Sequence, residues 1–136
     1  MFALRTSSRA HLVPTDGPEW TQVEAPPSEG PCVTIRPLSS SEFFEVSAIA
    51  RLKARKALES AGLDPDDRDA SSKLEAAYVG PLAAAHGLVD VSGVPGVDRS
   101  NVMERLTPAR AAALGMAVFE LSMATADPFE PGGSVR

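Results

Sequence analysis

Residues 32–62 read CVTIRPLSSSEFFEVSAIARLKARKALESAG, and a change of pattern inside this stretch decides the fold class. Val33 and Ile35 alternate with polar neighbours, which is the period of a β-strand. The run Ser-Ser-Ser-Glu from Ser39 to Glu42 is a capping box, in which two side chains satisfy free amides at a helix start. Apolar residues then recur every three or four positions, which predicts one long helix directly after a strand. On that helix we expect a narrow core face of Phe43, Val46, Ala50, Ala54, Ala57 and Ala61.

The segment before this stretch is rich in proline. Residues 1–38 hold six of the twelve prolines of the chain, which excludes a long helix there. The runs at 20–23 and 32–36 read as two strands, and the prolines and glycine between them predict a hairpin loop. A weaker strand signal lies at 2–4.

The segment after it contains further helix signals. Asp64 followed by Pro65 predicts a second helix start, and Gly80 with Pro81 predicts a break or kink before Gly87. Residues 88–97 read as a structured connector. We expect a short helix at 99–106 capped by Asp98, and a last helix at 108–124 capped by Thr107, with Ala111, Leu114, Val118 and Leu121 turned inward.

Together these signals predict an α+β fold that is mostly α. A small N-terminal β-hairpin or three-stranded sheet precedes four to five helices. We expect a single domain over 1–126, with a β and loop part at 1–38 and a helical part at 39–126, followed by a flexible tail at 127–136.

Composition limits the function. The chain has 136 residues and a net charge of −5, which argues against a protein that coats nucleic acid. Aromatic residues make up only 5%, so a base-stacking platform is not expected. One cysteine and an N-terminus without an apolar signal region indicate a protein of the reducing cytoplasm, and no apolar run is long enough to span a membrane.

The sequence contains no complete motif for metal binding or catalysis. Asp64, Asp66 and Glu75 occupy positions one, three and twelve of a calcium loop, but a basic residue stands at position five and no glycine at position six. His86 reads as a residue at a helix end and His11 as a loop residue. Cys32 borders a strand, where small cysteines are commonly buried. We therefore expect no catalytic residue, cofactor or metal.

The one basic cluster consists of Arg51, Lys53, Arg55 and Lys56. These four side chains spread over two turns of the predicted long helix, behind acids in its first turn. Helix-dipole complementarity alone accounts for that order, so a solvated face is the simpler interpretation and a phosphate or acidic partner the alternative.

Two segments resemble small tail-assembly proteins of tailed phages and prophages, including tail assembly chaperones. The opening at 33–38, VTIRPL, followed by Ser41-Glu42-Phe43, is similar to their strand-then-helix start. The connector at 87–97, GLVDVSGVPGV, and the helices at 101–106 and 108–121 are similar to their C-terminal half. The connector here is shorter and lacks the tryptophan that those proteins carry.

The resemblance implies a non-enzymatic tail assembly factor that binds the tape measure protein or tail-tube subunits in the host cytoplasm. The alternatives are a structural virion component, such as a head–tail connector or tail-completion protein, and a small nucleic-acid-binding regulator. Self-association stays open. The candidate partner-binding residues lie off the core face of the long helix, namely Phe44, Ile49, Leu52 and Leu58, and packing against the hairpin would explain them equally well.

Overall fold

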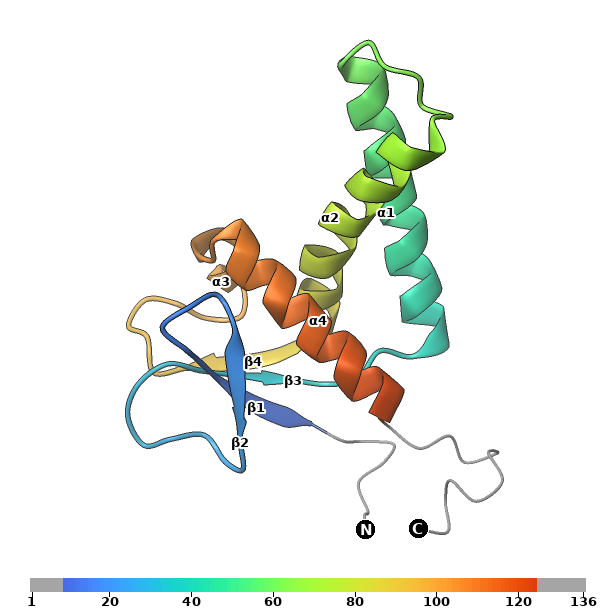
Figure 1. The fold of residues 1–136 in the computed structure, drawn as a ribbon. Coiled ribbons are helices and arrows are strands. Elements are labelled where there is room, and N and C mark those ends of the chain that lie inside the picture. The colour runs from blue at the N-terminus through green and yellow to red at the C-terminus, as the bar shows by residue number, and fades with distance from the viewer. Residues whose placement is uncertain (1–8, 125–136) are drawn as a thin grey trace, which may run out of the picture.

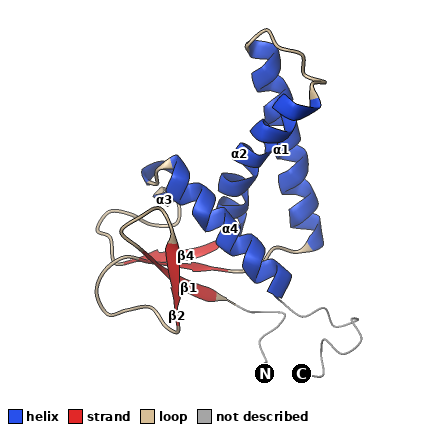
Figure 2. Ribbon diagram, in the orientation of Figure 1, coloured by secondary structure: helices blue, strands red, loops and turns tan. Residues whose placement is uncertain are grey.

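The computed structural model describes residues 9–124 and confirms an α+β fold. Its elements follow the order β1 Ala10–Pro14, β2 Trp20–Val23, β3 Cys32–Ile35, α1 Ser40–Ser60, α2 Arg68–Gly87, β4 Leu88–Ser92, α3 Val102–Arg105 and α4 Pro108–Ala124. The strands form one antiparallel sheet, and α4 lies along one of its faces while α1 and α2 project away as a pair (Figures 1 and 2). Within the described part, none of the helices is both long and apolar enough to cross a membrane.

The sheet has four strands in the order β2-β1-β3-β4, so the predicted hairpin between 20–23 and 32–36 is wrong. Strand β1 lies between those two runs, with Leu12 opposite both Gln22 and Val33. The fourth strand, β4, comes from the connector that follows α2, inside the part expected to be helical. It pairs with β3, with Asp90 opposite Thr34. The strand expected at 2–4 and the tail expected at 127–136 lie outside the described residues.

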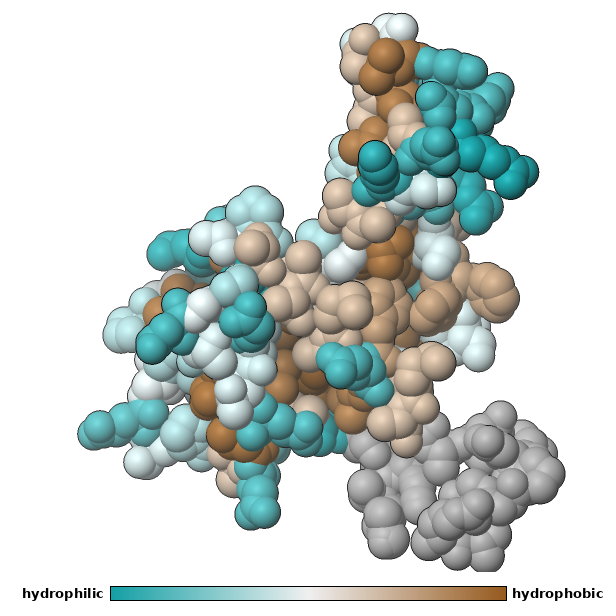
Figure 3. Space-filling view, viewed as in Figure 1, coloured by the Kyte–Doolittle hydropathy of each residue, from teal (hydrophilic) through white to brown (hydrophobic). Residues whose placement is uncertain are grey.

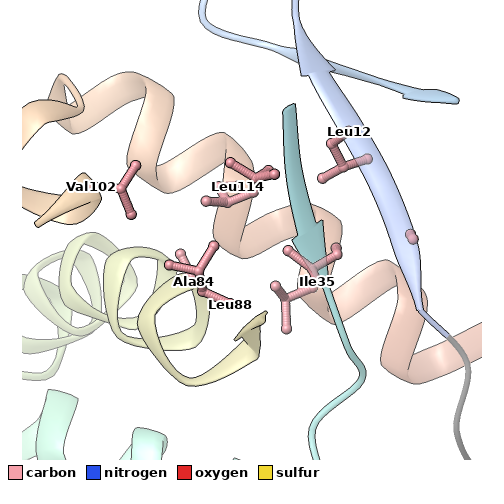
Figure 4. Packing of buried hydrophobic residues seen from close by; sticks show 9 residues of the cluster. Leu12, Ile35, Ala84, Leu88, Val102 and Leu114 are labelled. Carbon is pink, nitrogen blue, oxygen red and sulfur yellow. The ribbon is translucent and has the colours of Figure 1, made fainter. Parts of the chain in front are cut away.

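The core lies between the sheet and two helices. Leu12, Ile35 and Leu88 from the sheet region meet Leu114 of α4, with Ala84 of α2 beside them (Figure 4). All five are at most 4% exposed. Burying such side chains contributes roughly 25 cal/mol per Å² of apolar surface, so this contact between layers holds α4 on the sheet.

Helix α1 begins as predicted. The amide of Glu42 donates to the Ser39 hydroxyl at 3.2 Å, and the Ser39 amide donates to the Glu42 carboxylate at 3.0 Å. The buried face repeats strictly every four residues as Val46, Ala50, Ala54 and Leu58. Of the other residues expected on this face, Ala57 is half-buried, whereas the assignments of Phe43, which is 43% exposed, and of Ala61, which is exposed, are wrong. The buried row has a spacing of four residues and packs on α2.

Helix α2 begins at Arg68, whereas the sequence predicted a start at Pro65 with Asp64 as the N-cap. Asp67 is the cap, and its carboxylate accepts from the amides of Asp69 and Ala70 at 3.1 and 3.3 Å. Asp64 instead closes a turn by accepting from the amide of Asp66 at 2.9 Å. The helix then continues through Pro81 to Gly87, so of the predicted break or kink the break is wrong. A proline costs one helix hydrogen bond, and packing of α2 between α1 and α4 offsets that loss.

The C-terminal third is close to its prediction. Helix α3 covers only 102–105, and Asp98 does not cap it but accepts from the amide of Ser100 at 2.9 Å. Helix α4 spans the predicted residues, and the Thr107 hydroxyl accepts from the amide of Arg110 at 3.2 Å. Of the residues expected to face inward, Ala111, Leu114 and Val118 are buried and Leu121 is half-buried.

Candidate partner-binding surface

The four partner-binding residues predicted on α1 do not lie together. Phe44 is 75% exposed and Leu52 is 60% exposed, so both are free to meet a partner. Ile49 is half-buried. Leu58 is only 2% exposed and belongs to the row that packs on α2, so its assignment to a partner-binding surface is wrong.

A second set of exposed apolar residues lies on α4 and was missed in the sequence. Met116 is 57% exposed and Met123 is 83% exposed, and Phe119 lies between them, half-buried. Their spacing of three and four residues places all three on one face of the helix. That face is turned away from the buried row of Ala111, Leu114 and Val118.

The α4 face continues onto the foot of α1. The rings of Phe43 and Phe119 meet edge to face, with centroids 5.3 Å apart and an interplanar angle of 63°. Phe43 is 43% exposed and is followed directly by Phe44. We define the aromatic–methionine patch as Phe43, Phe44, Met116, Phe119 and Met123.

The hydropathy of the surface agrees with this grouping. In the space-filling view, tan and brown residues run along α4 and onto the first turn of α1, whereas the far end of the α1 and α2 pair is brown and tan on one side and teal on the other (Figure 3). Contiguous exposed apolar surface on a folded protein commonly marks a site of protein or membrane interaction. Methionine is flexible and polarisable, so methionine-rich surfaces adapt to more than one apolar partner.

The foot of α1 is held in place by Arg36, which follows β3. Its guanidinium binds the Glu42 carboxylate through both terminal nitrogens, with Nη1 at 2.9 Å from Oε1. Nη2 also donates to the carbonyl of His86 at 2.9 Å, and the Arg36 amide donates to the carbonyl of Gly87 at 2.8 Å. One side chain thus joins the end of β3 to the start of α1 and the end of α2, which fixes Phe43 and Phe44 relative to the sheet.

This ion pair changes the titration of Glu42. The hydrogen bonds from Arg36 lower the pKa of Glu42 from 4.5 to about 2, partly opposed by desolvation. The same hydrogen bonds raise the pKa of Arg36 above its ordinary value. At neutral pH both groups are charged, and the cation at the foot of α1 is neutralised by its partner.

Helix α4 carries one acid and one base. Glu120, the one acid of α4, is exposed and lies within one turn of both Met116 and Met123. Glu45 is exposed and follows Phe44. The one cation of α4, Arg110, is directed to the β1 and β2 connection, where it donates to the carbonyls of Glu19 and Thr15 at 2.7 and 3.0 Å.

The basic cluster lies elsewhere, towards the far end of α1. Arg55 binds Asp66 at 2.9 Å, and Arg51 lies 3.8 Å from Glu75, around an open hollow of about 420 Å³. Lys53 and Lys56 are exposed. The hollow is lined by three arginines, Arg51, Arg55 and Arg68, and by two acids, Asp66 and Glu75, so it contains both signs of charge.

The groups considered for nucleophilic chemistry lie on or next to the sheet. Nδ1 of His11 is 2.8 Å from the Thr34 hydroxyl on the neighbouring strand. Cys32 is 2% exposed, and burial raises the pKa of its thiol, which keeps the sulfur protonated. His86 lies in the last turn of α2, half-buried. Between residues 9 and 124, no three His, Cys, Asp or Glu side chains converge as metal ligands.

Comparison of the chain with protein-family models, with curated proteins and with solved structures finds no match. The sequence contained one signal for the patch: α4 has a single acid and a single base in 17 residues, so most of its circumference is apolar. A helix of that kind belongs in an interior, and here the sheet and α2 cover only part of it.

Proposed function

We propose that this protein is a non-enzymatic assembly factor that binds an apolar helical segment of a partner protein through the aromatic–methionine patch. The resemblance to phage tail-assembly proteins gives the partner class, a tape measure or tail-tube subunit, and gives the host cytoplasm as the place of action. The role of the protein would be to cover apolar surface of that subunit until it polymerises.

The observation that carries this proposal is the exposed apolar face of α4. Met116 and Met123 are exposed and lie two helical turns apart on one face of α4. The rings of Phe43 and Phe119 pack against each other beside them. An amphipathic helix docks on such a surface by placing its own apolar residues, spaced by three and four, against the stripe. The patch lies on helices that the core and Arg36 hold in place. The patch is therefore preformed, and its own residues lose little conformational freedom when a partner binds.

Co-purification with the partner tests the proposal. A tagged copy is expressed together with the tail genes of its own phage or prophage, and captured subunits are identified by mass spectrometry. The double variant Met116→Gln and Met123→Gln keeps side-chain length but removes apolar surface. Leu63→Gln is the matched control, because Leu63 is 57% exposed at the connection between α1 and α2, away from the patch.

We expect the wild type and the control to capture a tape measure or tail-tube subunit, and the double variant to lose it. Finished particles should lack the protein. Presence in finished particles would instead favour the structural virion component. Capture of no tail subunit, or equal capture by all three proteins, would contradict the proposed function.

A further inference from the structure

An open groove of about 390 Å³ lies between the sheet and the C-terminal half of α4. It is lined by a different set of α4 residues from those of the aromatic–methionine patch. We propose that residues 1–8 of this same chain, MFALRTSS, occupy the groove and place Phe2 and Leu4 in it. This inference does not depend on the proposed function.

Both walls of the groove are largely apolar. Strands supply one wall and α4 the other, and the apolar lining residues are Ala10 and Leu12 of β1, Trp20 of β2, Ile35 of β3, and Ala117 and Leu121 of α4. Trp20, Ala117 and Leu121 are only half-buried, although they pack against the core. The volume equals roughly a dozen waters at about 30 Å³ each. Apolar side chains that displace this water become buried themselves and complete the burial of those three residues.

The chain enters the groove from the N-terminal side. The described residues begin at Arg9, and the next residue, Ala10, lines the groove. Leu4 stands six positions before Ala10, and an extended chain covers about 20 Å over six residues, so Phe2 and Leu4 can both reach the groove. A segment tethered over so short a distance acts at an effective concentration in the millimolar range, which favours it over a free competitor.

The composition of residues 1–8 fits this position. The first four residues, MFAL, are all apolar, and the next four, RTSS, are polar. Phe2 and Leu4 are large enough to displace several waters each, and the polar half can cross the rim of the groove in contact with solvent. The segment therefore combines an apolar anchor with a polar connection to β1.

The other end of the described chain lies close by but fits less well. Ala124 also lines the groove, and residues 125–136 follow it. In that segment the one aromatic residue, Phe129, stands between Asp127-Pro128 and Glu130-Pro131. Drawing Phe129 into an apolar groove would remove water from the two neighbouring carboxylates, which costs free energy. The MFAL run carries no such charge.

Trp20 makes the groove observable, because it lines the groove and is the one tryptophan in the chain. Its emission wavelength and its quenching by acrylamide report whether the groove is covered. In the full chain, the test variant is Phe2→Ser with Leu4→Ser, and the matched control is Phe129→Ser, which removes the aromatic residue of the other terminal segment. Urea unfolding of the same samples gives the unfolding equilibrium constant.

We expect Trp20 of the test variant to emit at longer wavelength and to be quenched more strongly than in the wild type. The unfolding equilibrium constant should rise by about tenfold or more, as the loss of one buried leucine or phenylalanine predicts. Phe129→Ser should change neither quantity. A test variant that matches the wild type overturns the inference, and so does a change of Trp20 that follows Phe129→Ser instead. A wild-type dimer whose Trp20 becomes more easily quenched on dilution overturns it too, because a second copy then covers the groove.

A measurement on the wild type keeps the inference testable if the test variant does not fold. In the monomeric full chain, nuclear Overhauser effects are expected between the ring protons of Phe2 and the methyl groups of Leu12 or the indole of Trp20. Their absence, with the other contacts of Trp20 observed, overturns the inference.

Discussion

Gly115 of α4 lies against Gly80 of α2 so closely that a β-carbon on Gly115 would overlap the Gly80 carbonyl group. In the other direction, a β-carbon on Gly80 would lie 3.1 Å from the α-carbon of Ala112. The two helices therefore touch through backbone at this point. This contact sets how far α4 lies from α2, and so fixes where the stripe of Met116 and Met123 stands in the molecule.

Gly115→Ala should destabilise the fold by about 1–3 kcal/mol, as overpacking of a tight contact does. Helix propensity alone predicts the opposite sign, a gain of roughly 1 kcal/mol, so the direction of the change is diagnostic. The measurement is urea unfolding followed by circular dichroism. Ala109→Gly, at an exposed position of the same helix, is the control and should lose about 1 kcal/mol. A Gly115→Ala protein as stable as the wild type would contradict the backbone contact.

The ion pair of Arg36 and Glu42 should make stability depend on pH in acid. Because the pKa of Glu42 is lowered from 4.5 to about 2, its contribution is fully present above 4.5 and is lost as the pH falls through 2. Glu42→Gln should cost about 1–2 kcal/mol at neutral pH, a figure reduced for the 39% exposure of the Arg36 side chain.

The check is the unfolding free energy of Glu42→Gln and wild type across that acid range. The difference between the two proteins should shrink as the pH falls from 4.5 towards 2. Glu45→Gln, an exposed carboxylate in the same helix, should change stability little at any pH. A constant difference between wild type and Glu42→Gln would show that the pair does not act through its charge.

Trp20 and Arg110 connect the loop between β1 and β2 to the first turn of α4. The indole N–H of Trp20 donates to the Arg110 carbonyl at 3.1 Å, and the guanidinium lies 5.4 Å from the centre of the indole ring. Arg110→Ala removes the cation–π contact and two hydrogen bonds to backbone carbonyls, so we expect a loss of about 1–3 kcal/mol.

Arg110→Ala should also change the fluorescence of Trp20, the one tryptophan in the chain. Emission spectra and thermal unfolding measure the two effects together. Arg105→Ala removes an exposed arginine nearby in sequence and should leave both unchanged. Equal effects of the two substitutions would mean that the fastening is not specific to Arg110.

Substitutions at Leu58 and Leu52 test which residues of α1 belong to the core and which to the surface. Leu58→Ala should cost about 2–5 kcal/mol, because the side chain is 2% exposed and its removal leaves a cavity against α2. Leu52→Ala should stay within about 0.5 kcal/mol, because its side chain is 60% exposed. Chemical unfolding of the two variants measures both values. Similar losses would contradict the assignment of Leu58 to the core.

The local features of this chain could be predicted because short-range chemistry produces them. The capping box at Ser39 and Glu42 needs only residues three positions apart, and it forms as predicted. The cap at Thr107, followed by proline at the first helical position, is equally local. The start of α2 was predicted wrongly because both Asp64 and Asp67 are suitable N-cap residues. In the structure Asp67 caps the helix and Asp64 accepts a hydrogen bond within the preceding turn.

The pairing of strands and the candidate surface could not be predicted in this way. Which strand lies beside β3 depends on β1 and β4, which are distant in sequence, and the local pattern of β3 is compatible with several neighbours. Gly80 reads as a helix breaker until Gly115 is known to lie against it. Met116 reads as one more apolar residue of an apolar helix until the sheet and α2 are seen to cover other sides.

The sequence by itself determined the fold class, the helix starts at Ser39 and Thr107 and the acidic character of the chain, because period, capping and charge are properties of neighbouring residues. Only the tertiary structure decided the order of the strands, the burial of Leu58 and the exposure of Met116 and Met123. The physical reason is that burial depends on which surfaces meet, and elements far apart in the chain supply those surfaces.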